Sequence, residues 1–248
     1  MSDRDDQILA HIGLYQLSLR CVLESQFFEG GNCGNVMQRL VTDQKVQRRD
    51  GLPGRLVYYQ LTRAEAKRRE LPESRARALQ NQALHSALAV LWFCSFGDRP
   101  RHRLEVSEVT QVLSDQLPTA IHCIERGSEQ HRILRMKVVD PESDDRTLLR
   151  SLRRTIHQTI EVPGLRPWIQ TGRYAFAVLT ETAARVERIR KVIQSDETLS
   201  SLATFVVEQA PGVRTLSQAI HDRLPEKTQQ QLQFPSPETT TLPGDAGN

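Results

Sequence analysis

Apolar residues recur at helical spacing through the first thirty positions of the chain. A first helix is predicted to begin near Asp3 to Asp6, because carboxylates stabilise a helix N-terminus. Ser18 can cap a second helix that follows closely. The apolar faces consist of Ile8, Leu9 and Ile12 in the first helix and of Leu19, Val22, Leu23 and Phe27 in the second. Both predicted helices are short and apolar on one side.

A third helix and a pair of strands follow. The glycine turn "EGGN" ends in Asn32, which can cap a helix with Val36, Met37, Leu40 and Val41 on its inner face. Beyond Asp43, "KVQRR" and "RLVYYQLT" are typical of strands joined by the turn "DGLPG", and Val57, Tyr59 and Leu61 alternate inward. Three helices and a two-stranded wing predict a winged helix-turn-helix domain over residues 1–72.

The middle of the chain predicts one long helix. Residues 73–96 keep helical spacing of apolar positions and become apolar on every side toward the end. Such a helix either connects two domains or forms a homodimer, with Leu84, Leu88, Leu91 and Trp92 as the contact face. Glycine and proline in "GDRPRHR" at 97–103 then predict an exposed basic loop. Residues 73–103 are therefore interpreted as a connecting helix and a basic loop.

The second half alternates strands with helices. "TAIHCIE" and "RILRMKVV" predict a hairpin, residues 145–160 a helix with Leu148, Leu149, Leu152 and Ile156 inward, and "YAFAVLT" a buried strand. Thr180 can cap a further helix, and "ATFVVE" predicts the last strand. The overall class is α+β, with a small mixed α/β sheet domain over 104–224. Residues 225–248 have almost nothing to bury and are expected to be disordered.

Composition is that of one or two water-soluble globular domains. The chain has 248 residues, 38% hydrophobic and 25% charged, and a net charge of +3, which is too mild to identify a polyanionic partner. Four separated cysteines without a CxxC pair favour a reducing compartment. No run approaches the roughly 18 apolar residues of a membrane span. A cytoplasmic protein is expected.

Positive charge is concentrated in the predicted winged helix. Nine basic and three acidic residues lie between 32 and 69, a local net charge of +6. The third helix would present Asn35, Gln38, Arg39 and Thr42 to the major groove, where Asn and Gln can pair with adenine and Arg with guanine. Phosphate contacts are expected from Lys45, Arg48, Arg49 and Arg55. Double-stranded DNA is the expected partner; the alternative is a protein-binding module whose arginines keep the hairpin soluble.

The layout resembles that of the plasmid replication-relaxation family of mobile-element proteins. The similarity rests on an early Asp-x-x-Ile-Leu, on "YYQLT" at the end of the wing, on His85, Leu88 and Val90, and on the strand before Arg185. In that family a winged helix precedes a restriction-endonuclease-like domain. The resemblance implies DNA handling in replication, mobilisation or transcriptional control, without naming a reaction.

The second domain resembles a PD-(D/E)XK endonuclease core by strand order but lacks its acids. Metal-dependent cleavage requires carboxylates on two neighbouring strands beside a lysine. Aligned by strand order, Thr119 and Arg135 occupy the acid positions and only Lys137 matches. The domain is therefore expected to be inactive, and Arg135 and Lys137 are candidates for a phosphate contact or simply the outward face of a strand. A metal-dependent nuclease or nicking enzyme is the alternative.

Other chemistry finds no support in the sequence. The seven histidines show no i, i+4 pair or zinc spacing, and no phosphate-binding glycine motif or nucleophile elbow occurs. The protein is expected not to be an enzyme, and no catalytic residue, metal, cofactor or small-molecule substrate is predicted.

Overall fold

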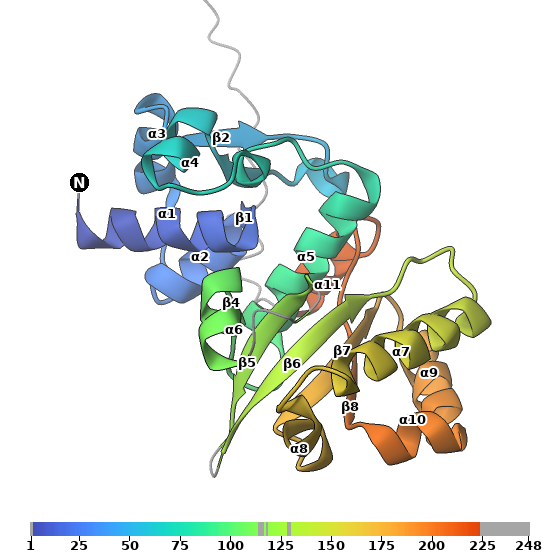
Figure 1. Cartoon of the computed structure of the whole chain (residues 1–248). Helices are drawn as coiled ribbons and strands as arrows, with labels where there is room; N and C mark the ends of the chain where they lie inside the picture. Colours follow the sequence, from blue (N-terminus) through green and yellow to red (C-terminus); the bar gives the residue numbers. More distant parts are fainter. Residues whose placement is uncertain (1, 114–116, 118, 128–129, 224–248) are drawn as a thin grey trace, which may run out of the picture.

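The computed structural model describes residues 2–113, 117, 119–127 and 130–223, and shows a mixed α+β protein with two sheets (Figure 1). A three-stranded antiparallel sheet near the N-terminus has the order β1–β3–β2. Its strands are β1 (Ser18–Leu19), β2 (Val46–Arg49) and β3 (Tyr58–Leu61). The surrounding helices are α1 (Asp3–Tyr15), α2 (Arg20–Phe27), α3 (Gly34–Thr42) and α4 (Arg63–Arg68). The predicted three helices and hairpin are confirmed, and β1 is an additional strand.

The helix starts are only partly as predicted. A capping box fixes the start of α1, where Ser2 and Asp5 exchange hydrogen bonds with each other's backbone N–H. Ser18 was expected to cap α2 but lies in β1, and its hydroxyl bonds to His11 at 3.1 Å. The N-cap residue of α3 is Cys33 rather than the predicted Asn32, although Asn32 Oδ1 accepts a hydrogen bond from the Gly34 N–H at 2.6 Å.

The central helix is shorter than predicted and lies inside the molecule. A 3₁₀ turn occupies Glu73–Arg75, and α5 runs only from Asn81 to Phe96. The residues offered as a dimer face are buried within the chain, with exposed fractions of 9% for Leu84, 1% for Leu88, 0% for Leu91 and 8% for Trp92. The predicted dimer face is therefore wrong, since these side chains already pack against the rest of the chain.

The second sheet has five strands in the order β4–β5–β6–β7–β8. The first three are antiparallel, and β6–β7 and β7–β8 are parallel. The bounds are β4 (Arg101–Leu104), β5 (Ile121–Arg126), β6 (His131–Val138), β7 (Tyr174–Thr180) and β8 (Phe205–Gln209). The remaining helices are α6 (Val106–Val112), α7 (Asp145–Ile160), α8 (Leu165–Gln170), α9 (Ala183–Ser195), α10 (Glu197–Leu202) and α11 (Leu216–Arg223). The predicted hairpin, the helix over 145–160 and the last two strands are confirmed.

The predicted exposed basic loop at 97–103 is wrong in its second half. Residues from Arg101 form β4, and the proposed boundary after residue 103 falls inside that strand. Arg101 is buried because it donates to Glu125 at 2.8 Å and to Glu208, and its guanidinium lies 3.8 Å from the centre of the Phe93 ring. Arg101 can be buried because Glu125 and Glu208, far along the chain, neutralise its charge.

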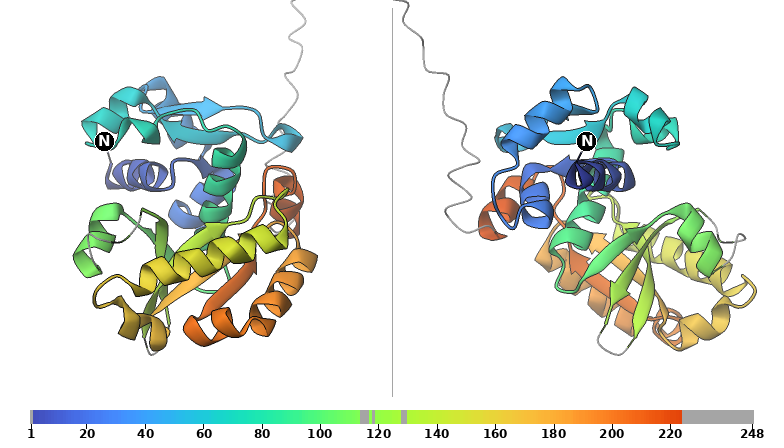
Figure 2. Two further views of the ribbon diagram at one scale, coloured as in Figure 1. Left: turned by 45° about the vertical axis from the view of Figure 1, so that its right-hand side comes forward. Right: turned by 90° about the vertical axis from the view of Figure 1, so that its left-hand side faces the viewer.

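Each face of the five-stranded sheet carries a different hydrophobic core. Tyr174, Phe176 and Val178 of β7 point to the core under α7, α8, α9 and α10, whereas the alternate residues of β7 point to α5. The α5 core also includes residues of α1, β1, β3 and α11 (Figure 2). The N-terminal elements and the five-stranded sheet therefore share a core across α5.

The C-terminal end of the described chain returns to the N-terminal hairpin. Thr182, rather than the predicted Thr180, caps α9 by accepting from the Arg185 N–H. Beyond β8, α11 packs against the hairpin turn, where Ser217 Oγ donates to the Pro53 carbonyl at 3.1 Å. The predicted disordered tail lies outside the described residues. Over the described part of the chain, no helix combines the length and the apolar character needed to cross a membrane.

Candidate nucleic-acid interface

The outward face of α3 carries the four residues predicted to contact bases. Met37 and Leu40 anchor the opposite face, with exposed fractions of 1% and 0%. This fixes the rotation of the helix, so that Asn35, Gln38, Arg39 and Thr42 are all exposed. The predicted outward positions are thus the ones observed.

Arg39 differs from the other three because it is bonded to another helix. Its guanidinium donates to Asp5 Oδ1 at 2.7 Å, although its side chain remains 54% exposed. Burial raises the pKa of Asp5, but hydrogen bonds from Ser2 and the charge of Arg39 outweigh it and hold the pKa below its ordinary value. Arg39 therefore lies on the α1 side of α3.

The hairpin places its basic residues on different sides. Consecutive strand residues point to opposite faces, so Arg48 pairs with Tyr59 and faces the cavity beside α3, while Arg49 pairs with Tyr58 on the other face. Arg49 is half-buried and its Nε has no hydrogen-bond partner within the described residues. Lys45 is also half-buried and lies 3.7 Å from Asp43. Of these residues, only Arg48 faces α3 across the cavity.

Arg55 occupies an unusual position in the hairpin turn. Gly54 and Arg55 both have positive φ, +69° and +58°, and the Leu56 N–H donates to the Pro53 carbonyl across them. This left-handed turn suits glycine at both central positions, and a side chain there costs about 1 kcal/mol. The chain nevertheless has arginine at the second position, where it is exposed and lines the cavity.

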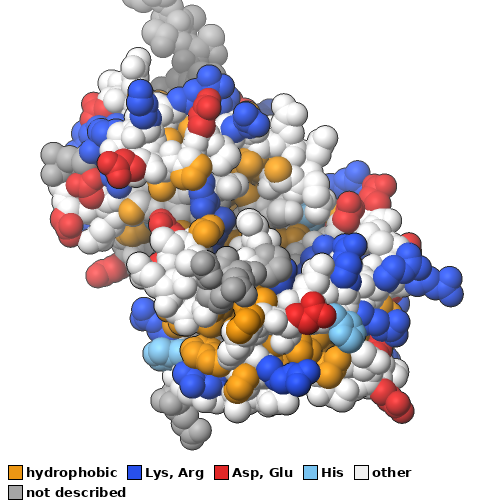
Figure 3. Space-filling model, viewed as in Figure 1, with side chains coloured by type: hydrophobic (Ala, Val, Ile, Leu, Met, Phe, Trp, Pro, Cys, Tyr) orange, Lys and Arg blue, Asp and Glu red, His pale blue; other side chains and the backbone are white. Residues whose placement is uncertain are grey.

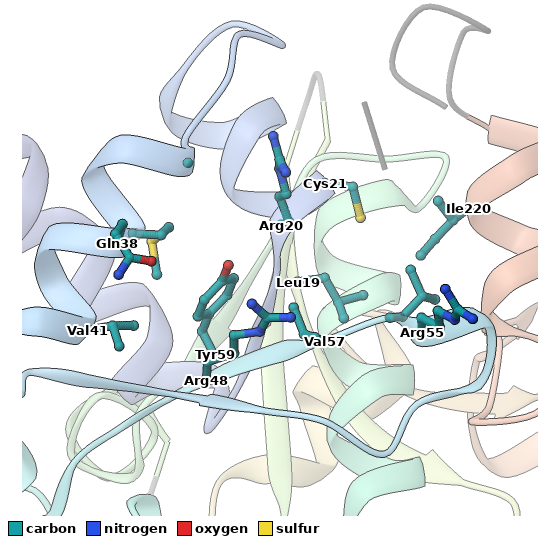
Figure 4. A pocket seen from close by; sticks show the side chains of 13 residues that line it. Leu19, Arg20, Cys21, Gln38, Val41, Arg48, Arg55, Val57, Tyr59 and Ile220 are labelled. Carbon is teal, nitrogen blue, oxygen red and sulfur yellow. The ribbon is translucent and has the colours of Figure 1, made fainter. Parts of the chain in front are cut away.

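A cavity of about 180 Å³ lies between α3, the hairpin and α11 (Figure 4). Its walls are apolar, whereas Gln38, Tyr59 and three arginines supply the polar lining. The apolar lining comprises Leu19, Cys21, Met37, Val41, Leu56, Val57 and Ile220. Burial raises the pKa of Cys21 to about 12, so that its thiol stays neutral. The cavity thus combines a neutral apolar interior with positive charge.

Arg20 is the third arginine at the cavity and was missed from the sequence. It donates to Glu24 at 2.8 Å and to Asn32 at 3.1 Å, which fixes the guanidinium at the start of α2. Its i, i+4 spacing to Glu24 is a local signal of an ordinary helical ion pair. Nothing in the sequence brings it to Gln38, Arg48 and Arg55, because that proximity depends on the packing of α2 against the hairpin.

The molecular surface carries basic side chains in two regions. In Figure 3, Lys and Arg gather over the three-stranded sheet and its helices at the top, and again over α7 on the right. Lys137 of β6 lines a separate cavity together with Asp140 and with Arg150 and Arg154 of α7. Lys137 is exposed, so it remains free to contact a phosphate.

Arg135 lies apart from that cavity, and its phosphate contact stays a prediction. It points beneath α7 and donates to Thr159 Oγ1 at 2.7 Å. His122 pairs with Arg135 across β5 and β6, is 2% exposed, and shares a hydrogen bond of 2.9 Å with the Tyr174 hydroxyl. Burial, with the charge of Arg135, lowers the pKa of His122 to about 4. Arg135, itself half-buried, therefore lies beside the buried polar residues His122 and Thr159.

The acid positions of a nuclease are not occupied by acids on these strands. Thr119, predicted to lie on the first hairpin strand, is exposed and precedes β5, which begins at Ile121. Glu125 of β5 is 1% exposed and bonded to Arg101 and Arg132. Within the described residues, no group of three or more His, Cys, Asp or Glu side chains is arranged to hold a metal ion.

The residues behind the family resemblance have structural roles. Arg185 donates to the carbonyl oxygens of Asp140, Pro141 and Ser143 and so fixes the loop after β6. His85 is 5% exposed and hydrogen-bonds to the Val139 carbonyl. Comparisons with protein-family models, curated proteins and solved structures found no match to this chain. The resemblance therefore remains a prediction.

Proposed function

We propose that the protein binds double-stranded DNA through residues 3–61, acting as a winged helix. The observation that carries this proposal is that Gln38 of α3 and Arg48 and Arg55 of the hairpin line one concave surface. A helix presenting amides to the major groove, flanked by arginines that reach phosphates, is a common arrangement for duplex recognition. The order of three helices and a hairpin supports the same assignment.

Each side chain has a distinct role in this proposal. Asn35 and Gln38 read base edges, since an amide can pair bidentately with adenine. Arg48 and Arg55 neutralise phosphates on one side of α3, and Arg39 does so on the α1 side once it leaves Asp5. Lys45 and Arg49 instead support the hairpin, because both are half-buried.

The five-stranded sheet is proposed to be an endonuclease-like fold without nuclease activity. Its antiparallel β4–β5–β6 followed by a helical crossover to the parallel β7 supports the fold assignment. Thr119 and Arg135, at the two positions where carboxylates would be needed, support the absence of metal-dependent cleavage. The proposed role is DNA binding in replication, mobilisation or transcriptional control of a plasmid or mobile element.

Selection of bound duplexes from a random pool tests this proposal. An enriched sequence is expected, and the double variant Asn35→Ala/Gln38→Ala should weaken binding to it by about 30-fold or more, since two lost base contacts at about 1–3 kcal/mol each cost at least about 2 kcal/mol. Affinity for unselected duplex should change little, because phosphate contacts remain. No duplex binding at low salt would overturn the proposal.

A further inference from the structure

We infer that the cavity between α3, the hairpin and α11 binds a small organic acid, with a compact apolar body and one carboxylate. The interior is formed before any ligand arrives, because its walls are held by the protein core. Exposed fractions are 3% for Leu19, 3% for Cys21, 1% for Met37 and 4% for Ile220. A volume of about 180 Å³ compares with the roughly 150 Å³ cavities that accept benzene, so one ring or a short branched chain fits.

The charge of the lining determines the ligand's polar group. Arg20, Arg48 and Arg55 line the cavity, and none of its lining residues within the described part of the chain is acidic. Figure 4 shows the three side chains coming from different elements, with Arg48 beside the Tyr59 ring. Arginine pairs with a carboxylate through two parallel hydrogen bonds, and the Gln38 amide and Tyr59 hydroxyl can donate as well.

Two of these arginines already have partners in the chain. Arg20 also donates to Glu24 and Asn32, and Arg48 lies 3.9 Å from Asp50. A bound carboxylate would therefore share these arginines with their present partners, whereas a neutral apolar molecule would gain nothing from them.

The apolar walls distinguish an organic acid from inorganic phosphate. Phosphate would satisfy the arginines but leave the half-buried surfaces of Val41 and Leu56 in contact with water. Burying an apolar body against them contributes about 25 cal/mol per Å² of surface removed from water. The cavity therefore favours a ligand that presents both an apolar surface and a negative charge.

The position of the cavity links this ligand to DNA binding. Gln38, Arg48 and Arg55 line the cavity and also belong to the proposed DNA interface. A carboxylate held by the arginines reduces the positive charge available to phosphates, so that acid and duplex compete. This competition rests on the proposed function, whereas the binding of the acid does not.

Methyl resonances of methionine provide a direct test in the full-length chain. The chain has three methionines, of which Met37 lines the cavity and Met136 lies in β6. Titration with salicylate or phenylacetate should shift the Met37 methyl signal and leave that of Met136 unchanged. Salicylamide and phenylacetamide, which lack the charge, should bind at least about tenfold more weakly than the acids. Equal binding of acids and amides, or of inorganic phosphate and the acids, would overturn the inference.

Three variants locate the site. Val41→Phe should fill the cavity and abolish the Met37 shift, and Arg55→Gln should weaken acid binding about tenfold. Arg166→Gln, an exposed change on α8, should leave it unchanged. An unchanged titration of the Val41→Phe variant, or no Met37 shift with either acid in the wild type, would show that the cavity is not the site.

The DNA arm of the experiment separates the two proposals. Millimolar acid should weaken duplex binding by the wild type and have less effect on Arg55→Gln. If the wild type binds the acid but no duplex, the proposed function fails and the ligand site stands. If it binds duplex but shifts no Met37 signal, the ligand site fails and the proposed function stands.

Discussion

Arg39 of α3 donates a hydrogen bond to Asp5 of α1 at 2.7 Å, across 34 positions of sequence. Asp5 is also the acidic member of the capping box that begins α1. One carboxylate thus fixes a helix start and restrains a side chain on the proposed DNA-reading face. Because the Arg39 side chain is half exposed, the pair is weak enough to exchange Asp5 for a phosphate.

Replacing Asp5 by asparagine should strengthen duplex binding. In the wild type, Arg39 must leave Asp5 before it contacts a phosphate, and breaking such an ion pair costs about 0.5–1 kcal/mol. The variant lacks this cost, so its affinity for duplex should be about twofold to fivefold higher. Fluorescence anisotropy of a labelled duplex measures the change. Asp3→Asn removes the same charge from the same helix but has no bond to Arg39. Equal gains in both variants would mean that Arg39 is not released onto DNA.

Arg55→Gly should stabilise the fold while weakening DNA binding. Glycine removes the cost of a side chain at φ +58°, which is worth up to about 1 kcal/mol in urea unfolding. The same change deletes one proposed phosphate contact. Gly54→Ala should destabilise the fold. The Gly54 backbone has φ +69°, and an added Cβ would lie 2.7 Å from Ser217 Oγ. Loss of stability in Arg55→Gly would contradict the strained turn.

Replacing Arg135 by alanine should lower the unfolding free energy much more than replacing Lys137 by alanine. Arg135→Ala removes the hydrogen bond to Thr159 and leaves a gap beside His122, which should cost about 1–3 kcal/mol of unfolding free energy. Lys137→Ala, at an exposed position, should change stability by less than about 0.5 kcal/mol. Urea denaturation compares the two. Similar losses would place Lys137 inside the fold or Arg135 outside it.

His122 should make the protein less stable as the pH falls from about 7 to 4. Its pKa is about 4 in the folded chain, against an ordinary value of 6.5, because burial disfavours the charged imidazolium. In that interval the unfolded chain binds a proton that the folded chain does not, so the stability present above pH 6.5 is lost. The loss amounts to about 3 kcal/mol at most.

The variant His122→Gln should flatten part of this pH dependence. Burial and the charge of His102 also lower the pKa of His11 to about 4, so a residual slope of the same sign is expected. His157→Gln, at an exposed position on α7, should leave the profile unchanged. Unfolding free energies measured at several pH values provide the comparison, and an identical profile for His122→Gln would contradict the assignment.

Elements with strong periodicity were predictable from the sequence alone. β7 is apolar from Tyr174 to Leu179, and Leu148, Leu152 and Ile156 repeat at helical spacing in α7, so each pattern predicts one type of element. β1 has only two residues and pairs with β3 forty positions later, which leaves no local signal. β4 contains two buried arginines, and their burial depends partly on Glu125 and Glu208, far along the chain.

The candidate site was predictable in its parts but not in its arrangement. Helical periodicity gave the outward residues of α3, because Met37 and Leu40 determine the inward face. The separation of Arg48 from Arg49 follows from strand alternation, yet the side that faces α3 depends on how the hairpin packs. Ile220 lines the cavity only because α11 packs back against the hairpin, and no local pattern predicts that packing.

The salt dependence of duplex binding tests the central claim most directly. With about four phosphate contacts, log Kd should change with log salt concentration at a slope of magnitude about 4, at 0.9 per phosphate. Arg48→Gln with Arg55→Gln should lower that magnitude by about 2. A control pair on the far helices, Arg166→Gln with Lys191→Gln, should leave it unchanged. Duplex binding by the wild type with the same slope in the Arg48/Arg55 variant, or no binding at all, would contradict the account.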